Sequence, residues 1–285
     1  MDRILFGDNQ FFAVNHLSDE KARAQSIQFR KDEAIIKVLD TTIDLGIKTF
    51  MCTTHDRIAG ICDHIRDNPS KYKGFKIFPC MPYAHKYANA VTELGIIGAL
   101  KEYLPGNIFA TVAKGGIAFA RKDFIAMMEL LIDAEMKMLR GIDTPVIFIQ
   151  NVVTDLILGL GMKDILRAYH SYIIKKYNSE PGYITMNLPL LLNVLSEVGI
   201  KNPIICSSIN KIGFRMSGGI ELYEKTIREG KFRPIAMQVL ASGALRPEHA
   251  FEYVCKQKKI ESILFGSSSR EHIKHSIDLI QKYSQ

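Results

Sequence analysis

The sequence predicts an α/β protein, a (β/α)8 TIM barrel with an inserted segment before the fourth strand. Short apolar segments rich in β-branched residues alternate with longer helical patterns, which is typical of parallel strands joined by crossover helices. Polar residues gather directly after many of these segments, as expected where the strands of a barrel end. The length of 285 residues also suits a barrel, which typically takes about 250. A doubly wound open sheet is the alternative.

More segments read as strands than the eight that a barrel needs. They cover residues 3–7, 48–52, 76–81, 107–112, 145–150, 182–186, 203–207, 234–239 and 262–266. Either 76–81 or 107–112 is therefore an inserted element or part of a helix. Amphipathic helices are predicted between the strands, most clearly over 31–45 and 123–139, where apolar residues recur three or four positions apart. No linker or repeat divides the chain, so we expect a single domain over residues 1–285.

Composition and charge limit the partners. With 47% hydrophobic and 24% charged residues the chain is globular in composition, and its apolar runs fall far short of the roughly 20 residues of a membrane-spanning helix. A net charge of +7 favours an anionic partner; because the basic residues are scattered, a small phosphorylated ligand fits better than nucleic acid. We therefore expect neither a membrane nor a nucleic acid as partner. The alternative is that the charge only keeps the protein soluble.

The N-terminus and the cysteines favour a cytoplasmic protein. An acidic residue at position 2 and a turn by position 7 leave neither a basic leader nor an apolar signal core. The five cysteines are odd in number and lie in apolar contexts, which suits reduced thiols. The apolar segment 82–104 is a candidate contact between the subunits of a homo-oligomer.

The first predicted strand ends in Asp8, Asn9 and Gln10. At a barrel mouth, an aspartate can act as a general base and amides can orient a polar ligand. Asp8 is the strongest carboxylate candidate because it comes directly off the strand. A merely polar turn is the alternative.

A histidine, an aspartate and an arginine follow the second strand. His55, beside Asp56 and Arg57, can move protons near neutral pH. Alternatively, Asp56 caps the following helix and His55 is simply solvated. The nearby Cys62 and His64 invite a zinc interpretation, but they lie two apart on a predicted helix and point to different sides, so we expect no metal.

Further candidates follow later strands. Lys114 is a reactive amine or phosphate ligand at a strand end, or else a loop lysine. Asn187, Asn210 and Arg215 follow the fifth and sixth strands, where amides and a guanidinium suit an anionic or carbonyl-bearing ligand. Gln150 ends the fourth strand.

The last predicted strand runs into a small polar turn that opens a helix. The turn consists of Gly266, Ser267, Ser268 and Ser269, and the helix begins near Arg270. Backbone N–H groups and the helix dipole would face an anion there, which makes the turn a candidate phosphate site. The alternative is a capping box, because Ser268 and Glu271 have the S-x-x-E spacing; capping and binding are compatible.

Several motifs resemble aldo-keto reductases. PIAMQVLASGAL and IESILFGSSSREHIKHSIDLI are similar to the family's seventh and eighth strands, the eighth with its Gly-Ser-Ser phosphate loop. ILFGDNQFF, DLGIKTFMCTT, PVIFIQN, GYITMN and PIICSSIN resemble the first, second, fourth, fifth and sixth strands. The resemblance covers most of the chain outside residues 69–140. It implies a TIM barrel and, at the phosphate loop, the adenosine side of NADPH.

The family's tetrad of Asp, Tyr, Lys and His is mostly missing. In these reductases the tyrosine protonates the carbonyl while hydride arrives from NADPH. Met51 stands where the aspartate is expected, the tyrosine position holds no tyrosine, and Gln150 replaces the histidine. Lys114 matches the lysine if 107–112 is the third strand; if 76–81 is, Pro79 or Cys80 takes its place.

Three functions follow from this pattern. The favoured one is an enzyme that acts on a phosphorylated or nucleotide-linked small molecule by non-redox chemistry, as a lyase, isomerase or hydrolase. The second is an NADPH-dependent carbonyl reductase with a rearranged site. The third is a catalytically silent barrel that binds a ligand. We assign catalysis to Asp8, His55, Lys114 and Gln150. We assign ligand binding to Asn9, Gln10, Asn187, Asn210, Arg215, Gly266, Ser267, Ser268, Ser269 and Arg270.

Overall fold

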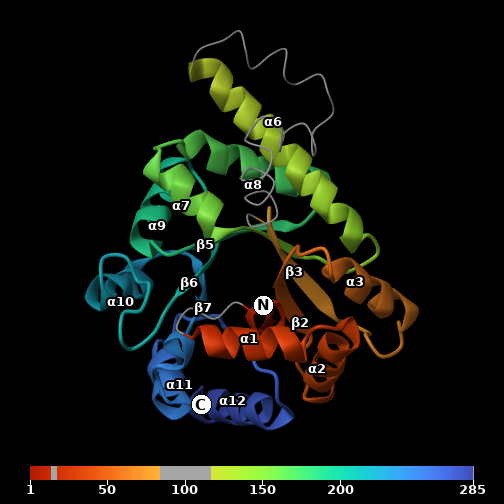
Figure 1. The fold of residues 1–285 in the computed structure, drawn as a ribbon. Coiled ribbons are helices and arrows are strands. Elements are labelled where there is room, and N and C mark those ends of the chain that lie inside the picture. Colours follow the sequence, from red (N-terminus) through yellow and green to blue (C-terminus); the bar gives the residue numbers. More distant parts are fainter. Residues whose placement is uncertain (14–17, 84–116, 285) are drawn as a thin grey trace.

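The computed structural model, which describes residues 1–13, 18–83 and 117–284, is a closed barrel of eight parallel strands. Each strand pairs with the next along the chain, and β8 pairs with β1 to close the cylinder (Figure 1). The strands are β1 (Ile4–Gly7), β2 (Thr49–Thr53), β3 (Lys76–Met81), β4 (Val146–Ile149), β5 (Glu180–Thr185), β6 (Ile204–Ser208), β7 (Arg233–Met237) and β8 (Ser262–Phe265). Closure confirms the predicted TIM barrel and excludes the open sheet.

The ambiguity about the third strand is resolved in favour of 76–81. This segment forms β3 between β2 and β4, with Cys80 beside Phe148 of β4. Segment 107–112 lies outside the described residues, as does most of the candidate subunit contact 82–104. The connection from β3 to β4 is the longest in the barrel, which agrees with the insertion predicted before the fourth strand.

Helices surround the strands (Figure 1). They are α1 (Asp19–Gln28), α2 (Asp32–Asp44), α3 (Ile58–Asp67), α6 (Ile117–Met136), α7 (Asn151–Gly159), α8 (Lys163–Tyr177), α9 (Leu188–Glu197), α10 (Ile220–Glu229), α11 (Pro247–Lys256) and α12 (Arg270–Tyr283), with short 3-10 helices η1 (Asn9–Phe12), η2 (Lys137–Leu139) and η3 (Ala241–Gly243). The helix predicted over 31–45 is α2, which buries Ile35 and Leu39. The helix predicted over 123–139 is the second part of α6 followed by η2.

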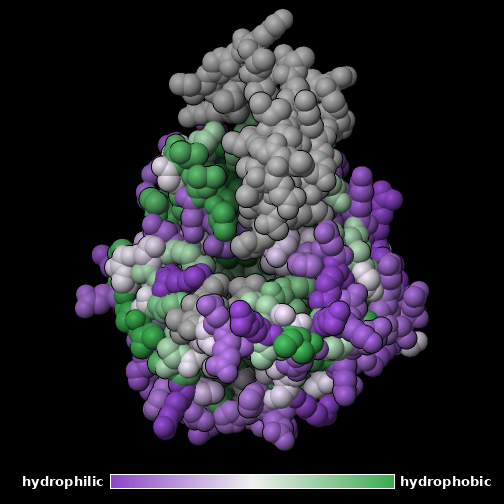
Figure 2. All heavy atoms as spheres, viewed as in Figure 1, coloured by the Kyte–Doolittle hydropathy of each residue, from purple (hydrophilic) through white to green (hydrophobic). Residues whose placement is uncertain are grey.

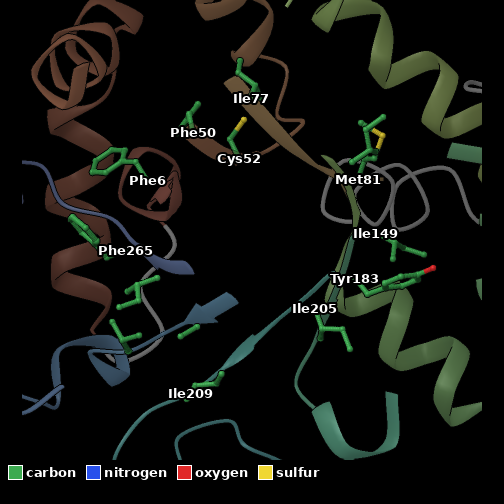
Figure 3. Packing of buried hydrophobic residues seen from close by; sticks show 14 of the residues in the cluster. Phe6, Phe50, Cys52, Ile77, Met81, Ile149, Tyr183, Ile205, Ile209 and Phe265 are labelled. Carbon is green, nitrogen blue, oxygen red and sulfur yellow. The ribbon is translucent and has the colours of Figure 1, made fainter. Parts of the chain in front are cut away.

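The strands separate two apolar layers. Alternate side chains of a barrel strand point inward and outward, so on β4 Phe148 faces the interior and Ile147 faces the helices. Figure 3 shows part of the outer layer, where β1, β2 and β3 contribute Phe6, Phe50 and Ile77. The inner layer consists of Leu5, Met51, Phe78, Cys80, Val146, Phe148, Ile184, Ile204, Cys206 and Ile235. These side chains fill the interior of the barrel beneath its C-terminal mouth. The polar residues at the strand ends therefore lie above a packed apolar layer.

The surface is mostly polar, with one apolar stripe. Figure 2 shows hydrophilic residues over most of the visible face and hydrophobic ones gathered over α7, where Val152, Leu156 and the C-cap residue Leu160 are exposed at four-residue spacing. None of the described helices has the length and apolar character that crossing a membrane requires. All five cysteines are buried free thiols, in agreement with the prediction from their number and context.

Ion pairs join strands at the N-terminal end of the barrel. Arg233 on β7 lies 2.9 Å from Glu261, just before β8, and 2.7 Å from Glu180 on β5. The amino group of Met1 lies 3.0 Å from Glu261 and adds the start of the chain to the same group. In TIM barrels this end usually serves stability rather than catalysis.

Replacement of Glu261 by Gln is expected to lower the Tm at neutral pH but not in acid. Hydrogen bonds from Arg233 lower the pKa of Glu261, although partial burial acts in the opposite direction. Because the folded pKa lies below the unfolded value of about 4.3, the pair stabilises the protein above that value and loses its effect as pH falls through the folded pKa. Thermal melts across pH measure this, with Glu229→Gln at an exposed pair as the control. A difference in Tm that does not change with pH would contradict the role.

Candidate functional site

A cavity of about 470 Å³ opens at the C-terminal ends of the strands. Its wall takes residues from the ends of seven strands, Arg215 from the loop that follows β6, and Gln25 from α1. This is the size of a typical small-molecule site and the position where TIM-barrel enzymes hold theirs. Of the predicted site residues, the cavity wall contains Asp8, Asn9, Gln10, Gln150, Arg215 and Gly266.

Asp8 is the one carboxylate among the described residues of the cavity wall. It follows β1 and is only 6% exposed. One carboxylate oxygen accepts hydrogen bonds from the Thr53 backbone N–H at 2.8 Å and the Thr53 hydroxyl at 2.6 Å. Burial raises the pKa of Asp8 from its ordinary value, and the bonds from Thr53 only partly oppose this. A buried carboxyl group with a raised pKa in a cleft is a candidate for a general acid or base.

The floor of the cavity next to Asp8 is not nucleophilic. Cys80 on β3 and Met51 on β2 lie in its lining. Burial, followed by the nearby Asp8 and Cys206, raises the pKa of the Cys80 thiol well above its usual value. Because the thiolate is the reactive form, Cys80 stays a protonated, apolar wall residue. With 76–81 as the third strand, the position at which the resemblance to aldo-keto reductases implies a lysine falls at Pro79 or Cys80.

Tyr83 is a site residue that the sequence interpretation missed. It follows β3 and lines the cavity, and its backbone N–H donates to the buried Glu135 carboxylate of α6 at 3.1 Å. Burial, then Asp8 and Asp56, raise the pKa of its phenol. The only signal available in the sequence was its position two residues after segment 76–81, which became informative once that segment proved to be β3.

His55 lies behind the cavity wall and not in it. Its ring stacks on Phe12 with centroids 4.2 Å apart, and it lies 5.5 Å from the ring of Tyr83. Its Nδ1 accepts the backbone N–H of Arg57 at 3.2 Å, and the Arg57 side chain pairs with Asp32 at 2.6 Å. The His55 ring and the Arg57 side chain, predicted to belong to one proton-transfer group, are therefore directed to different partners. Any action of His55 on a ligand would pass through Phe12 or Tyr83, which do line the cavity.

The amides of the strand ends divide into two groups. Gln150 and Asn9 line the cavity, as does Gln10, whose Nε2 donates to the Gly7 carbonyl at 2.8 Å. Asn187 instead caps α9 by accepting the Leu190 N–H at 3.3 Å.

Asn210 is fully buried and holds the loop after β6. It donates to the Phe214 carbonyl at 2.9 Å and accepts the Phe214 N–H at 2.8 Å. Asn187 and Asn210 lie outside the cavity lining and shape the loops around it.

Arg215 follows directly on the loop that Asn210 holds. Its backbone has φ of 55°, a left-handed conformation uncommon for a residue with a side chain. It is the one cationic side chain among the described residues of the cavity wall, and no described carboxylate forms an ion pair with it. Arg215 is thus placed to meet an anionic ligand at the mouth.

The serine turn after β8 is built differently from the predicted capping box. Ser269, one residue later than expected, is the N-cap of α12 and accepts the His272 N–H at 3.2 Å. Arg270 lies 3.6 Å from Asp44 of α2. Only Gly266 reaches the cavity, and a Cβ placed there would lie 2.1 Å from Gln10 Oε1, so Gln10 occupies the space beside it.

Lys114 lies outside the described residues. The other tetrad positions are described: Met51 and Gln150 both face the cavity, and no lysine occurs among the described residues of its wall. The site therefore combines a buried carboxyl, a phenol, a guanidinium and several amides. That set can move protons and bind an anion.

No family model matches the sequence, and no curated protein sequence matches it. Among solved structures, a candidate aldo-keto reductase from Pseudomonas aeruginosa aligns over 100% of this chain and 92% of its own, with a TM-score of 0.58 and 13% identity. A candidate 2,5-diketo-D-gluconic acid reductase B aligns over 99% of this chain and 86% of its own, with a TM-score of 0.55 and 9% identity. At such identities the likeness concerns the fold, and this chain has the aldo-keto-reductase-like (β/α)8 fold that its motifs predicted.

Proposed function

We propose that the protein is an enzyme that performs non-redox acid–base chemistry, of the lyase, isomerase or hydrolase type, on a small phosphorylated or nucleotide-linked molecule. The observation that carries this proposal is Asp8, a buried carboxyl with a raised pKa in the wall of the strand-end cavity. Perturbed carboxyls in clefts are characteristic of catalytic acids and bases. The fold supplies the scaffold, and the chemistry is inferred from the side chains in the cavity.

In this proposal Asp8 takes a proton from the substrate and returns it to a second position or to the leaving group. Thr53 fixes one carboxylate oxygen through two hydrogen bonds, which leaves the other oxygen for the substrate. Gln150 and Asn9 donate to oxygens of the substrate that gain charge during proton transfer. Arg215 holds the anionic group of the substrate.

A second candidate, NADPH-dependent reduction, is favoured by Tyr83, which brings a phenol into the cavity wall. The raised pKa of that phenol argues against it, because it makes Tyr83 a weaker acid than free tyrosine. The serine turn also fits the cofactor poorly, since Gln10 fills the space beside Gly266 and the Ser269 hydroxyl is engaged at His272. No step of the proposed mechanism therefore runs through NADPH.

A thermal-shift screen separates these candidates. The panel contains sugar phosphates, nucleotide sugars, NADPH and NADH, because a ligand that binds only the folded protein raises the Tm by mass action. We expect a phosphorylated substrate-like compound to raise the Tm, and neither NADPH nor NADH to do so. NADPH that raised the Tm and was oxidised in the presence of a carbonyl compound would favour the reductase instead.

A further inference from the structure

A carboxylate that the proposed chemistry does not use is buried behind the cavity wall. It belongs to Glu135 on α6, which is only 2% exposed and lies outside the cavity lining. One of its oxygens accepts the hydroxyl hydrogen of Thr54, and both oxygens lie within reach of the Tyr83 backbone N–H, at 3.1 and 3.2 Å. Taking a carboxylate out of water is costly, so a buried one persists where hydrogen bonds compensate the loss.

The donors to Glu135 belong to the ends of two neighbouring strands. Thr54 directly follows β2, and Tyr83 lies two residues after β3. The register between these strands ends at Thr53 and Cys80, so the ladder between them no longer fixes the chain beyond that point. Glu135 therefore bridges the two segments just where they leave the sheet.

The same bridge extends to Asp8. Thr53 binds the Asp8 carboxylate through its backbone N–H and its hydroxyl, and the next residue, Thr54, binds Glu135. Consecutive side chains of a strand point to opposite faces, which explains why the two carboxylates lie on opposite sides of the end of β2. Tyr83 lines the cavity together with Asp8, and burial, then the Asp8 charge, raise the pKa of its phenol. One buried carboxylate thus joins the anchor of Asp8 to a phenol near it.

A second helix carboxylate has a similar arrangement far from Asp8 in strand order. Asp155 on α7 accepts the Thr185 hydroxyl hydrogen and, at 3.0 Å, the backbone N–H of Met186, which lines the cavity. Both donors come from the end of one strand, β5, which lies four strands from β1 in the barrel. Asp155 therefore fixes one strand end, whereas Glu135 sets the position of one strand end relative to another.

We propose that Glu135 is a positioning residue of the cavity, which holds the Tyr83 phenol near Asp8 so that both groups face the same substrate. Glu135 acts through the Tyr83 backbone and the Thr54 hydroxyl and does not touch the ligand. The inference rests on the proposed function, in which Asp8 moves the proton. Because burial and the Asp8 charge raise the pKa of the phenol, Tyr83 stays protonated and offers the substrate a hydrogen-bond donor.

Fluorine NMR of the full chain labelled with 3-fluorotyrosine tests this role without a substrate. The resonance that Tyr83→Phe removes is assigned to Tyr83. We expect Glu135→Leu, which accepts no hydrogen bond, to shift or broaden that resonance and to lower the pKa of the phenol toward its ordinary value, because the ring becomes less buried. Glu135→Gln should largely restore the resonance, since Thr54 and Tyr83 both reach the same side-chain oxygen and one amide oxygen can accept both.

Two more variants make the test specific. Asp155→Leu is the matched control, because it removes the similar helix carboxylate at β5 and should leave the Tyr83 resonance unchanged. Thr54→Val removes one contact of Glu135, so it should shift the resonance by less, and it becomes the decisive variant if Glu135→Leu does not fold. An unchanged Tyr83 resonance in the decisive variant, or an equal change in Asp155→Leu, would overturn the positioning role.

Turnover separates this inference from the proposed function. For the sugar phosphate or nucleotide sugar that the thermal-shift screen identifies, Glu135→Leu is expected to lower kcat about ten-fold, because small misplacements of active-site groups are costly. If Asp8→Asn kept full turnover, the acid–base function would fail while the fluorine result stood. If Asp8→Asn abolished turnover and Glu135→Leu left kcat unchanged, the acid–base function would stand and the positioning role would fail.

Discussion

Asp8→Asn is expected to lower kcat by about 10²- to 10⁴-fold, the usual loss when a general acid–base group is removed. The change is nearly isosteric, and the Asn side-chain oxygen can still accept both hydrogen bonds from Thr53. The loss would therefore report the missing proton transfer and not a collapsed site. Turnover of the compound found by the thermal-shift screen measures it.

The same substitution is expected to raise the Tm at neutral pH. Burial raises the pKa of Asp8, so the folded protein binds a proton more tightly than the unfolded chain does. Stability is then lost as pH rises from the unfolded pKa, about 3.9, through the folded pKa, because ionised Asp8 is held away from water. Asn carries no charge and avoids this loss. The Tm advantage of the variant should therefore grow with pH and vanish in acid.

Asp56→Asn is the control for both measurements, since Asp56 is exposed and lies outside the cavity wall. It should change neither kcat nor the pH dependence of the Tm appreciably. An Asp8→Asn protein that kept full turnover, or whose Tm fell at neutral pH, would show that Asp8 is a structural residue of the β1 turn.

Gly182→Ala is expected to destabilise the barrel by about 1–3 kcal/mol or more, a fall of several degrees in Tm. Gly182 on β5 pairs with Phe148 on β4, and a Cβ at Gly182 would lie 2.4 Å from the Phe148 ring. Phe148 is fully buried in the inner layer and cannot move outward into water. The added methyl group must therefore shift the ring or separate two strands. Urea or thermal unfolding measures the loss.

Two further variants make that test specific. Gly159→Ala, at the end of α7, has nothing within 4 Å of the new Cβ and should leave the Tm unchanged or slightly raised. Phe148→Leu removes the clashing ring, so combining it with Gly182→Ala should cost less than the sum of the two single changes. Additive losses in the double variant would show that the two side chains do not compete for the same space.

The barrel could be predicted from the sequence because most strands are marked twice, by an apolar run and by the polar cluster after it. The pattern failed only where 76–81 and 107–112 carried equal signals, since a local pattern contains no information on pairing. Asp8 could be selected because it comes directly off the first strand, and Arg215 because it lies in the segment after the sixth strand; both line the cavity. Tyr83 and Gln25 were missed because one depended on the identity of β3 and the other reaches the cavity from a helix outside the barrel pattern.

Some predicted ligand residues have structural roles for a physical reason. A strand end that opens a helix needs acceptors for the first backbone N–H groups, and Asn and Ser satisfy that need with the same atoms that would bind a ligand. The side-chain oxygens of Asn187 and Ser269 each accept such a backbone N–H. Sequence cannot separate the two uses, because both require a short polar side chain at the same position.

The packed inner layer also determines how a ligand can enter and leave the cavity. Leu5, Phe78 and Phe148 plug the barrel below the cavity, and the ion pairs of Arg233 and Glu261 tie strands together at its far end. The cylinder is thus a cup and not a tunnel. Substrate and product must therefore use the same opening, because neither can pass through the barrel to its other end.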